Sequence, residues 1–284
     1  MVRFMMQLTG RSVRTEFALD AVGPRTWTAT VDPSWRGWTG PHGGVITGLL
    51  VDVARAAAGA VRAVDMRFLG RPRDGAFVFE PCVHTVGRST TIVDVTAYQN
   101  REAVAAGSIT LGRTTVSGVA ERSAGAGGPG ASGGHARADG AGLDVAPPED
   151  CDLFALPPEI VPVGAHFEIR PAAGPLPLSG SDRAWMCAWI ALVPELVTDA
   201  ASLAVLADAL PPTIFPTLTV PLAVPTVAMS LYAHTDLAVA PAQPVLVTAS
   251  NVSTGGGWSV DDVDIRDRAG RLLVQARQTR RVVG

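Results

Sequence analysis

Hydrophobic and polar residues alternate along much of the chain with the period of two that predicts β-strands. In the first half, the segments with this strand-like character are 15–19, 26–31, 64–69, 76–86, 90–99 and 103–111. In the second half they are 165–170, 184–192, 224–233, 245–252, 259–266 and 271–282. Short Gly- and Asn-containing sequences separate several neighbouring segments, which favours antiparallel hairpins.

Each half also contains one segment with the period of a helix. From Val45 to about Val61, apolar residues recur at helical spacing and small residues abound, which predicts a tightly packed, almost wholly buried helix. The second such segment runs from Asp199, which suits an N-cap, to Leu210. The order of strands, one helix and more strands therefore occurs twice.

The two halves are separated by a segment of different composition. Within residues 119–150 a long run of Gly, Ala and Ser lacks large apolar residues, as in a flexible linker. We therefore expect an N-terminal repeat at 1–118, a linker at 119–150 and a C-terminal repeat at 151–284. The segment Val64–Leu69 aligns with Val227–Tyr232, which supports a duplication. The alternative is a chance similarity between two unrelated α+β domains.

Composition narrows the possible partners and compartments. The chain of 284 residues is 47% apolar and 17% charged, which is typical of a globular protein. Its net charge of -3 offers no basic surface for nucleic acid. The three scattered cysteines, Cys82, Cys151 and Cys187, predict a reducing, cytoplasmic setting. The most apolar region, 209–229, contains five prolines, so we expect a soluble protein with no membrane-spanning helix.

Three polar residues stand out in apolar surroundings of the second half. Asp208 lies at the end of the second predicted helix, Thr226 opens a strand after Pro225, and Gln278 lies in the last strand. Each has an ordinary explanation, since Asp208 could be a solvated helix residue, Thr226 a strand opener and Gln278 a solvated position. The first repeat has Ala63 where the second has Thr226, so only one repeat carries this set.

Several short motifs together give the chain a family resemblance. The motifs are His42-Gly43-Gly44 before the first helix, Phe68-Leu69-Gly70-Arg71-Pro72, Gly87-Arg88-Ser89, Gln99, and Thr226 with Ser230 and His234. With Asp208 and Gln278, they resemble the type II acyl-CoA thioesterases, enzymes with two hotdog domains in one chain. Ala228 and Met229 depart from the Asp-His pair that is usual in that family.

This resemblance implies an α+β double hotdog, in which each repeat wraps a curved antiparallel sheet around a central helix. It implies hydrolysis of acyl-CoA, with Asp208 as general base, Thr226 and Gln278 positioning the attacking water, and no covalent intermediate. Gly43 and Gly44 would hold the oxyanion, since helix N-termini favour negative charge. It implies no cofactor and a homo-oligomer of double-hotdog protomers.

Other functions remain as alternatives. A double-hotdog scaffold could bind acyl chains or a partner protein without catalysis. An enoyl-CoA hydratase would need an Asp–His pair, and no histidine follows Asp208 at close spacing. No pair of histidines has metal-ligand spacing with a carboxylate or cysteine, and no G-x-S-x-G motif is present. Arginines at 67, 71, 88 and 280 could contact CoA phosphates or simply be solvated.

Overall fold

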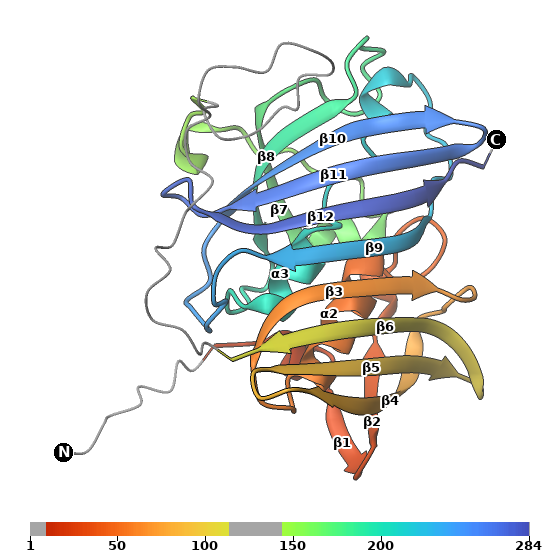
Figure 1. The fold of residues 1–284 in the computed structure, drawn as a ribbon. Helices are drawn as coiled ribbons and strands as arrows, with labels where there is room; N and C mark the ends of the chain where they lie inside the picture. The colour runs from red at the N-terminus through yellow and green to blue at the C-terminus, as the bar shows by residue number, and fades with distance from the viewer. Residues whose placement is uncertain (1–9, 114–143, 284) are drawn as a thin grey trace.

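The computed structural model describes residues 10–113 and 144–283. These residues form one antiparallel sheet with its helices packed against one side of it (Figure 1). The strands of the first half are β1 (Asp20–Gly23), β2 (Thr26–Val31), β3 (Ala60–Phe68), β4 (Gly75–Val86), β5 (Thr90–Gln99) and β6 (Glu102–Gly112). Those of the second half are β7 (Phe167–Ala173), β8 (Trp185–Leu192), β9 (Thr226–Ala233), β10 (Val245–Gly255), β11 (Trp258–Arg266) and β12 (Leu272–Arg281).

The sheet has the strand order β1-β2-β4-β5-β6-β3-β9-β12-β11-β10-β8-β7. The two halves therefore meet where β3 pairs with β9, and within that pairing Met66 lies opposite Met229. The same two residues correspond in the sequence alignment of the repeats. An antiparallel pair in which corresponding residues lie opposite each other relates the halves by an approximate two-fold axis. The architecture is a double hotdog, as the sequence predicts.

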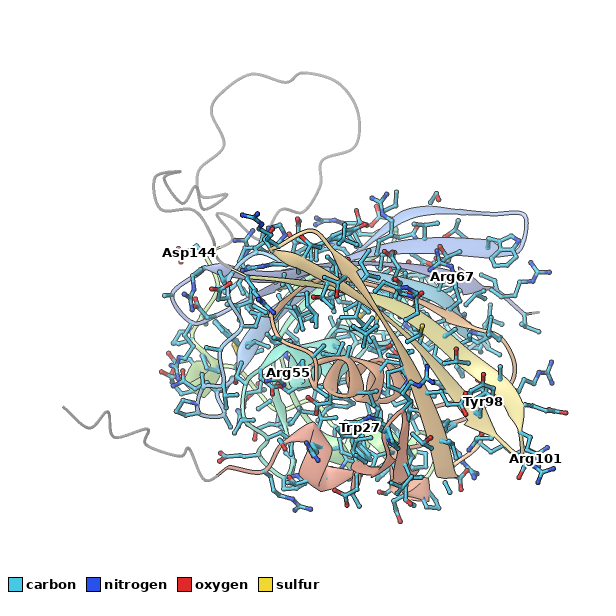
Figure 2. All side chains as sticks on the ribbon, turned by 60° about the horizontal axis from the view of Figure 1, so that its bottom comes forward. Trp27, Arg55, Arg67, Tyr98, Arg101 and Asp144 are labelled. Carbon is cyan, nitrogen blue, oxygen red and sulfur yellow. The ribbon has the colours of Figure 1, made fainter. Side chains whose placement is uncertain are left out.

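Two buried helices, α2 (Gly43–Ala54) and α3 (Ala200–Leu206), form the centre of the molecule and pack against each other. Their close approach depends on glycine. A methyl group at Gly44 would lie 2.6 Å from the carbonyl oxygen of Val205, and one at Gly48 would lie 2.8 Å from that of Ala201. Figure 2 shows the strands of the first half curving around the α2 helix.

Both central helices are shorter than the sequence predicts. The α2 helix ends at Ala54 rather than near Val61, because residues from Ala60 onwards pair with β6. The α3 helix begins after Asp199, whose carboxylate accepts hydrogen bonds from the N–H groups of Ala201 and Ser202, as expected of an N-cap. It ends at Leu206, and the chain then turns towards Pro211, which cannot continue a helix.

The prediction of a strand at 15–19 is wrong. Those residues overlap the short helix α1 (Val13–Glu16), which begins with a capping box. The Ser12 side chain accepts a hydrogen bond from the Thr15 N–H, and the Thr15 side chain accepts one from the Ser12 N–H. These local hydrogen bonds outweigh the alternating pattern.

The remaining helices are short 3-10 turns. They are η1 (Pro33–Trp35), η2 (Pro148–Asp150), η3 (Pro162–His166) and η4 (Phe215–Thr217). Most of the predicted linker, 119–143, lies outside the described residues, and its end contains η2. The predicted domain boundaries remain a prediction. No helix of 10–113 or 144–283 is both long and apolar enough to cross a membrane.

Candidate active site

Asp208 lies in the turn after α3, at the point where this helix meets the N-terminus of α2. Its side chain is only 9% exposed. One carboxylate oxygen, Oδ2, accepts a hydrogen bond of 3.1 Å from the Gly44 N–H. The other, Oδ1, accepts one of 3.1 Å from Arg280. The carboxylate of the second half is therefore bound by the main chain of the first half.

Thr226 and Gln278 come from the neighbouring strands β9 and β12. Gln278 is fully buried, and its Nε2 donates a hydrogen bond of 2.9 Å to the carbonyl oxygen of Ala207, which immediately precedes Asp208. The Thr226 hydroxyl donates to Gln278 Oε1 at 3.4 Å. The structure thus brings the three predicted residues together at one end of the helix pair. Arg280 bridges Asp208 and Thr226.

Arg280 is the part of the site whose position was not predicted. Its side chain is 8% exposed, and its guanidinium donates to Thr226 Oγ1 at 2.8 Å and to Asp208 Oδ1 at 3.1 Å. Its Nε lies 3.0 Å from Asp261 Oδ2. Arg280 is therefore neither solvated nor free for a CoA phosphate. The alternating pattern of β12 could have indicated this position, because residues 278 and 280 lie on the same face of the strand.

Asp261 of β11 is a second buried carboxylate in this region, with a side chain only 1% exposed. It accepts hydrogen bonds from the Thr213 hydroxyl and N–H, from the Ser259 hydroxyl and from the Asn251 amide. These donors satisfy a charge that would otherwise be costly to bury. Sequence reasoning missed it because neighbouring Asp262 and Asp264 made the strand appear uniformly acidic.

His42 also reaches Asp208 from the first half. It occupies the N-cap position of α2, and its Nε2 lies 2.8 Å from the Asp208 carbonyl oxygen and 3.6 Å from Oδ2. Because a carbonyl oxygen can only accept, Nε2 carries the hydrogen in this contact. The Nδ1 atom is buried and has no hydrogen-bond partner among the described residues. The Asp–His proximity that the sequence did not indicate therefore arises between the repeats.

The glycine pair allows these groups to come close to one another. A methyl group at Gly43 would lie 2.8 Å from Asp208 Oδ2, and one at Gly44 would lie 2.9 Å from the His42 ring. The Gly44 N–H donates to Asp208 in this structure. The predicted contact of Gly43 and Gly44 with an oxyanion remains a prediction.

The opposite end of the helix pair contains a different set of residues. There, Asp52 of α2 and the N-cap Asp199 of α3 share the guanidinium of Arg55, at 2.9 Å and 2.6 Å. Figure 2 labels Arg55. Burial, together with the nearby Asp199 carboxylate, raises the pKa of Asp52 to about 6. The two ends of the helix pair differ because the paired strands carry different residues there. Thr226 pairs with Arg280 in the second half, whereas the corresponding pair in the first half is Ala63 with Thr110.

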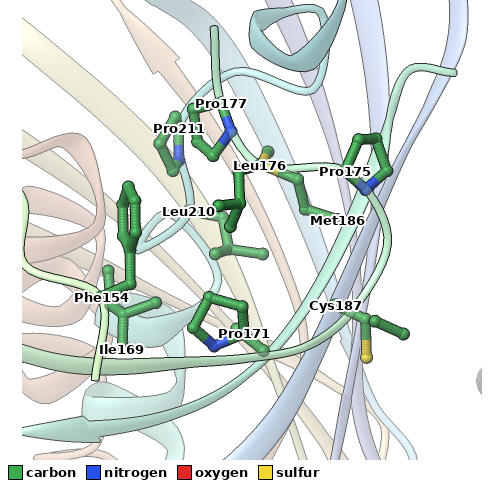
Figure 3. A pocket seen from close by; sticks show the side chains of 12 residues that line it. Phe154, Ile169, Pro171, Pro175, Leu176, Pro177, Met186, Cys187, Leu210 and Pro211 are labelled. Atoms are coloured by element: carbon green, nitrogen blue, oxygen red, sulfur yellow. The ribbon is translucent and has the colours of Figure 1, made fainter. Parts of the chain in front are cut away.

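A small apolar pocket lies beside the active-site end of α3. The space that it encloses is about 20 Å³, and the pocket is partly open to solvent. Its walls are apolar residues of β7, β8 and two Pro-containing segments; Figure 3 labels Phe154, Ile169, Pro171, Pro175, Leu176, Pro177, Met186, Cys187, Leu210 and Pro211. Leu210 is two residues after Asp208, so their Cα atoms are within about 8 Å. Among the described residues, no group of three or more acidic, His or Cys side chains could hold a metal.

Comparisons with solved structures agree with this architecture. A hot-dog-fold protein of unknown function from Alicyclobacillus acidocaldarius superposes with a TM-score of 0.79 at 22% identity, covering 96% of this chain and 98% of that one. A candidate thioesterase II from Thermobifida fusca gives 0.76 at 21% identity, covering 98% and 99%. Acyl-CoA thioesterase II from Mycobacterium marinum gives 0.66 at 17%, covering 96% and 98%. At these identities the likeness establishes the fold alone.

Family models give a more specific result. No curated protein matches the chain significantly. The model of the acyl-CoA thioesterase N-terminal domain matches residues 31–112, and that of the acyl-CoA thioesterase C-terminal domain matches residues 148–282. The two matches follow the two halves of the sheet and include Gly43, Gly44, Asp208, Thr226 and Gln278. The chain therefore belongs to the acyl-CoA thioesterase family, with a double-hotdog fold.

Proposed function

We propose that this protein hydrolyses acyl-CoA thioesters by base-activated water, without a covalent intermediate. The observation that carries the proposal is the buried carboxylate of Asp208, held by Gly44 and Arg280 close to Thr226 and Gln278. A general base must be held within hydrogen-bond reach of the water from which it takes the proton. A buried carboxylate that accepts one hydrogen bond on each of its oxygens is held in place for that task.

In the proposed reaction, Asp208 takes a proton from a water molecule whose oxygen bonds to the thioester carbonyl carbon. Thr226 and Gln278 orient that water, and N–H groups at the start of α2 hold the oxyanion. Gly43 is the better placed donor, since the Gly44 N–H already donates to Asp208. The C–S bond then breaks, the proton passes from Asp208 to the CoA sulfur, and the acid and free CoA leave.

The hydrogen bonds of Thr226 support attack by water. Its hydroxyl donates to Gln278 Oε1 and accepts from Arg280, so its proton is directed at an amide oxygen. A nucleophilic hydroxyl needs a neighbouring base that removes its proton, and an amide oxygen is not such a base. We therefore expect no acyl-enzyme in rapid-quench mass spectrometry, and an adduct of acyl mass would contradict this mechanism.

The apolar pocket beside Leu210 supports an acyl substrate. Burying apolar groups is favourable by about 25 cal/mol per Å² of surface, so a hydrocarbon chain would gain by lying there. We propose that the acyl chain of the substrate lies against this apolar surface, with its thioester beside Asp208. We further propose that the protein is cytoplasmic and that it forms a homo-oligomer. Light scattering of the purified protein checks the oligomeric state.

The test is hydrolysis of a panel of acyl-CoAs of increasing chain length, followed by release of the CoA thiol. Asp208→Asn should lower kcat by a factor of about 10² to 10⁴, the usual contribution of a general base. Asp262→Asn is the matched control. It makes the same change of residue type at a carboxylate that forms an ion pair with Arg277 on the exposed side of the strands. If wild type and Asp208→Asn are equally inert, a non-catalytic acyl-binding scaffold becomes the better interpretation.

The contact between His42 and Asp208 favours one second candidate, hydration of an enoyl-CoA. An imidazole and a carboxylate 3.6 Å apart could serve as the base and the acid of water addition. The predominant contact of His42, however, is with the Asp208 main chain at 2.8 Å. A spectrophotometric assay for loss of the enoyl double bond, run beside the thiol assay, separates the two reactions.

A further inference from the structure

Arg280 takes part in no proton transfer of the mechanism proposed above, although it holds Asp208 and occupies the centre of the site. Its guanidinium contacts Thr226, Asp208 and Asp261, and little of its side chain is exposed. A buried charge is retained only where it is paired and hydrogen-bonded, because desolvation is otherwise costly. Arg280 is paired by two hydrogen bonds and by the ion pair of Nε with Asp261, although Nε itself makes no hydrogen bond among the described residues. The position of Arg280 is therefore fixed by its partners.

Charged groups and hydrogen-bond donors surround Asp208 from four parts of the chain. Arg280 of β12 contributes a positive charge, and Asp261 of β11 a negative charge on the far side of the same guanidinium. His42, before α2, donates Nε2–H to the Asp208 main chain. Gly44 donates an uncharged N–H. One guanidinium therefore faces two carboxylates, which leaves it no surplus charge for a CoA phosphate.

We propose, on the basis of the function proposed above, that Arg280 is a positioning residue that fixes Asp208 against Thr226, and that Asp261 sets how strongly Arg280 acts on Asp208. A guanidinium is planar and its donors form a rigid fork. Its two terminal nitrogens bind Thr226 and Asp208, so the separation of these side chains follows from the geometry of the fork.

Asp261 has the opposite electrostatic effect to Arg280. A positive charge beside a carboxylate favours its ionised form and makes it a weaker proton acceptor. Because Asp261 lies 3.0 Å from the Nε of Arg280, it offsets part of that charge. Asp261 is itself held by Thr213, Ser259 and Asn251, so the offset is a fixed property of the fold.

The proposal predicts opposite effects of two substitutions on the pH dependence of hydrolysis. In Arg280→Gln, the acid limb of the kcat/KM profile should move to higher pH, since an adjacent positive charge is lost. In Asp261→Asn, the limb should move to lower pH. A role in folding alone would give no shift, or shifts in one direction. In Arg280→Gln, kcat should also fall by about tenfold or more, because Asp208 loses its position.

The same two strands offer matched controls. Arg277 and Asp262 lie opposite each other on β12 and β11 and form an ion pair of 2.6 Å on the exposed side. Arg277→Gln and Asp262→Asn should leave the acid limb in place. Arg280→Lys keeps the charge but loses the fork, so it should lower kcat with a smaller movement of the limb. This variant remains informative if Arg280→Gln does not fold.

A ¹³C NMR titration of the Asp208 carboxyl, assigned with Asp208→Asn, provides a readout that does not require activity. His42→Asn removes the other titrating group beside Asp208, and the limb should survive that change. If the wild type hydrolyses acyl-CoA but the two limbs move together or not at all, the role of Arg280 is refuted and the hydrolase remains. If the wild type is inert while the NMR titration midpoints move in opposite directions, the charge coupling stands and the proposed function is wrong.

Discussion

At the scale of single residues, Gly43 and Gly48 have different tasks on the same helix. A methyl group at 43 would meet the Asp208 carboxylate at 2.8 Å, whereas one at 48 would meet the carbonyl oxygen of Ala201 at 2.8 Å. Gly43→Ala should therefore displace the base and lower kcat at least tenfold, with unfolding little changed. Gly48→Ala should lower the free energy of unfolding by about 1–3 kcal/mol and change kcat much less. Kinetics and denaturant unfolding of both variants test this contrast, and equal kinetic losses would contradict it.

Asp52 gives a pH dependence of stability whose sign follows from its raised pKa. Its pKa is about 6 in the folded protein, against an ordinary value of 3.8 for an aspartate, so the folded state binds the proton more tightly. Stability should therefore fall as pH rises from about 4 to 6, by up to about 3 kcal/mol for a shift of this size. Asp52→Asn should remove this part of the slope in urea unfolding between those pH values. An unchanged slope would contradict the prediction.

Sequence reasoning selected Asp208, Thr226 and Gln278, which lie together in the structure, but it did not reveal that Arg280 and Asp261 are buried beside them. The first three stand out through apolar surroundings and the family motif. Arg280 and Asp261 lie in charged segments, and their burial depends on pairing between β11 and β12 and on a contact with the loop at Thr213. Such partners are distant in sequence, so local patterns cannot reveal them.

At the scale of elements, strands were predicted well and helix ends less well. The ranges of β2 and β5 agree with the alternating pattern to the residue, because each strand has one buried and one more exposed face. The α1 helix was mistaken for a strand, since only four residues form it and its capping box decides its conformation. Both α2 and α3 were predicted too long, because apolar residues continue beyond each helix. After α2 they belong to the turn and the start of β3, and after α3 they belong to the buried turn at 207–210.

The segment 175–177, which covers the apolar pocket, should influence chain-length preference. Leu176 lines the pocket and is 46% exposed, so a larger side chain there can fill the pocket without disturbing the core. Leu176→Trp should shift the preferred acyl-CoA to a shorter chain, measured as kcat/KM across the series. Leu153→Trp is the matched control, since Leu153 is 59% exposed and does not line the pocket. If both variants and the wild type prefer the same acyl chain length, the proposed location of the acyl chain at this pocket is wrong.

At the scale of the whole molecule, the pairing of β3 with β9 and the packing of α2 on α3 make the halves interdependent. Neither half can expose its inner face without breaking this continuous sheet and the helix contact. We therefore expect one cooperative unfolding transition, in which calorimetric and van't Hoff enthalpies agree. Two resolved transitions would show that the halves are stable separately.

The hydrogen bond from the Gly44 N–H to Asp208 has a practical consequence for assays. The proposed base, Asp208, belongs to one half and the Gly44 N–H that holds it belongs to the other, so a small separation of the halves should lower turnover. Turnover should then decline at denaturant concentrations where circular dichroism still reports an intact sheet. If the protein hydrolyses acyl-CoA as proposed, its turnover would thus report how firmly the two halves are docked.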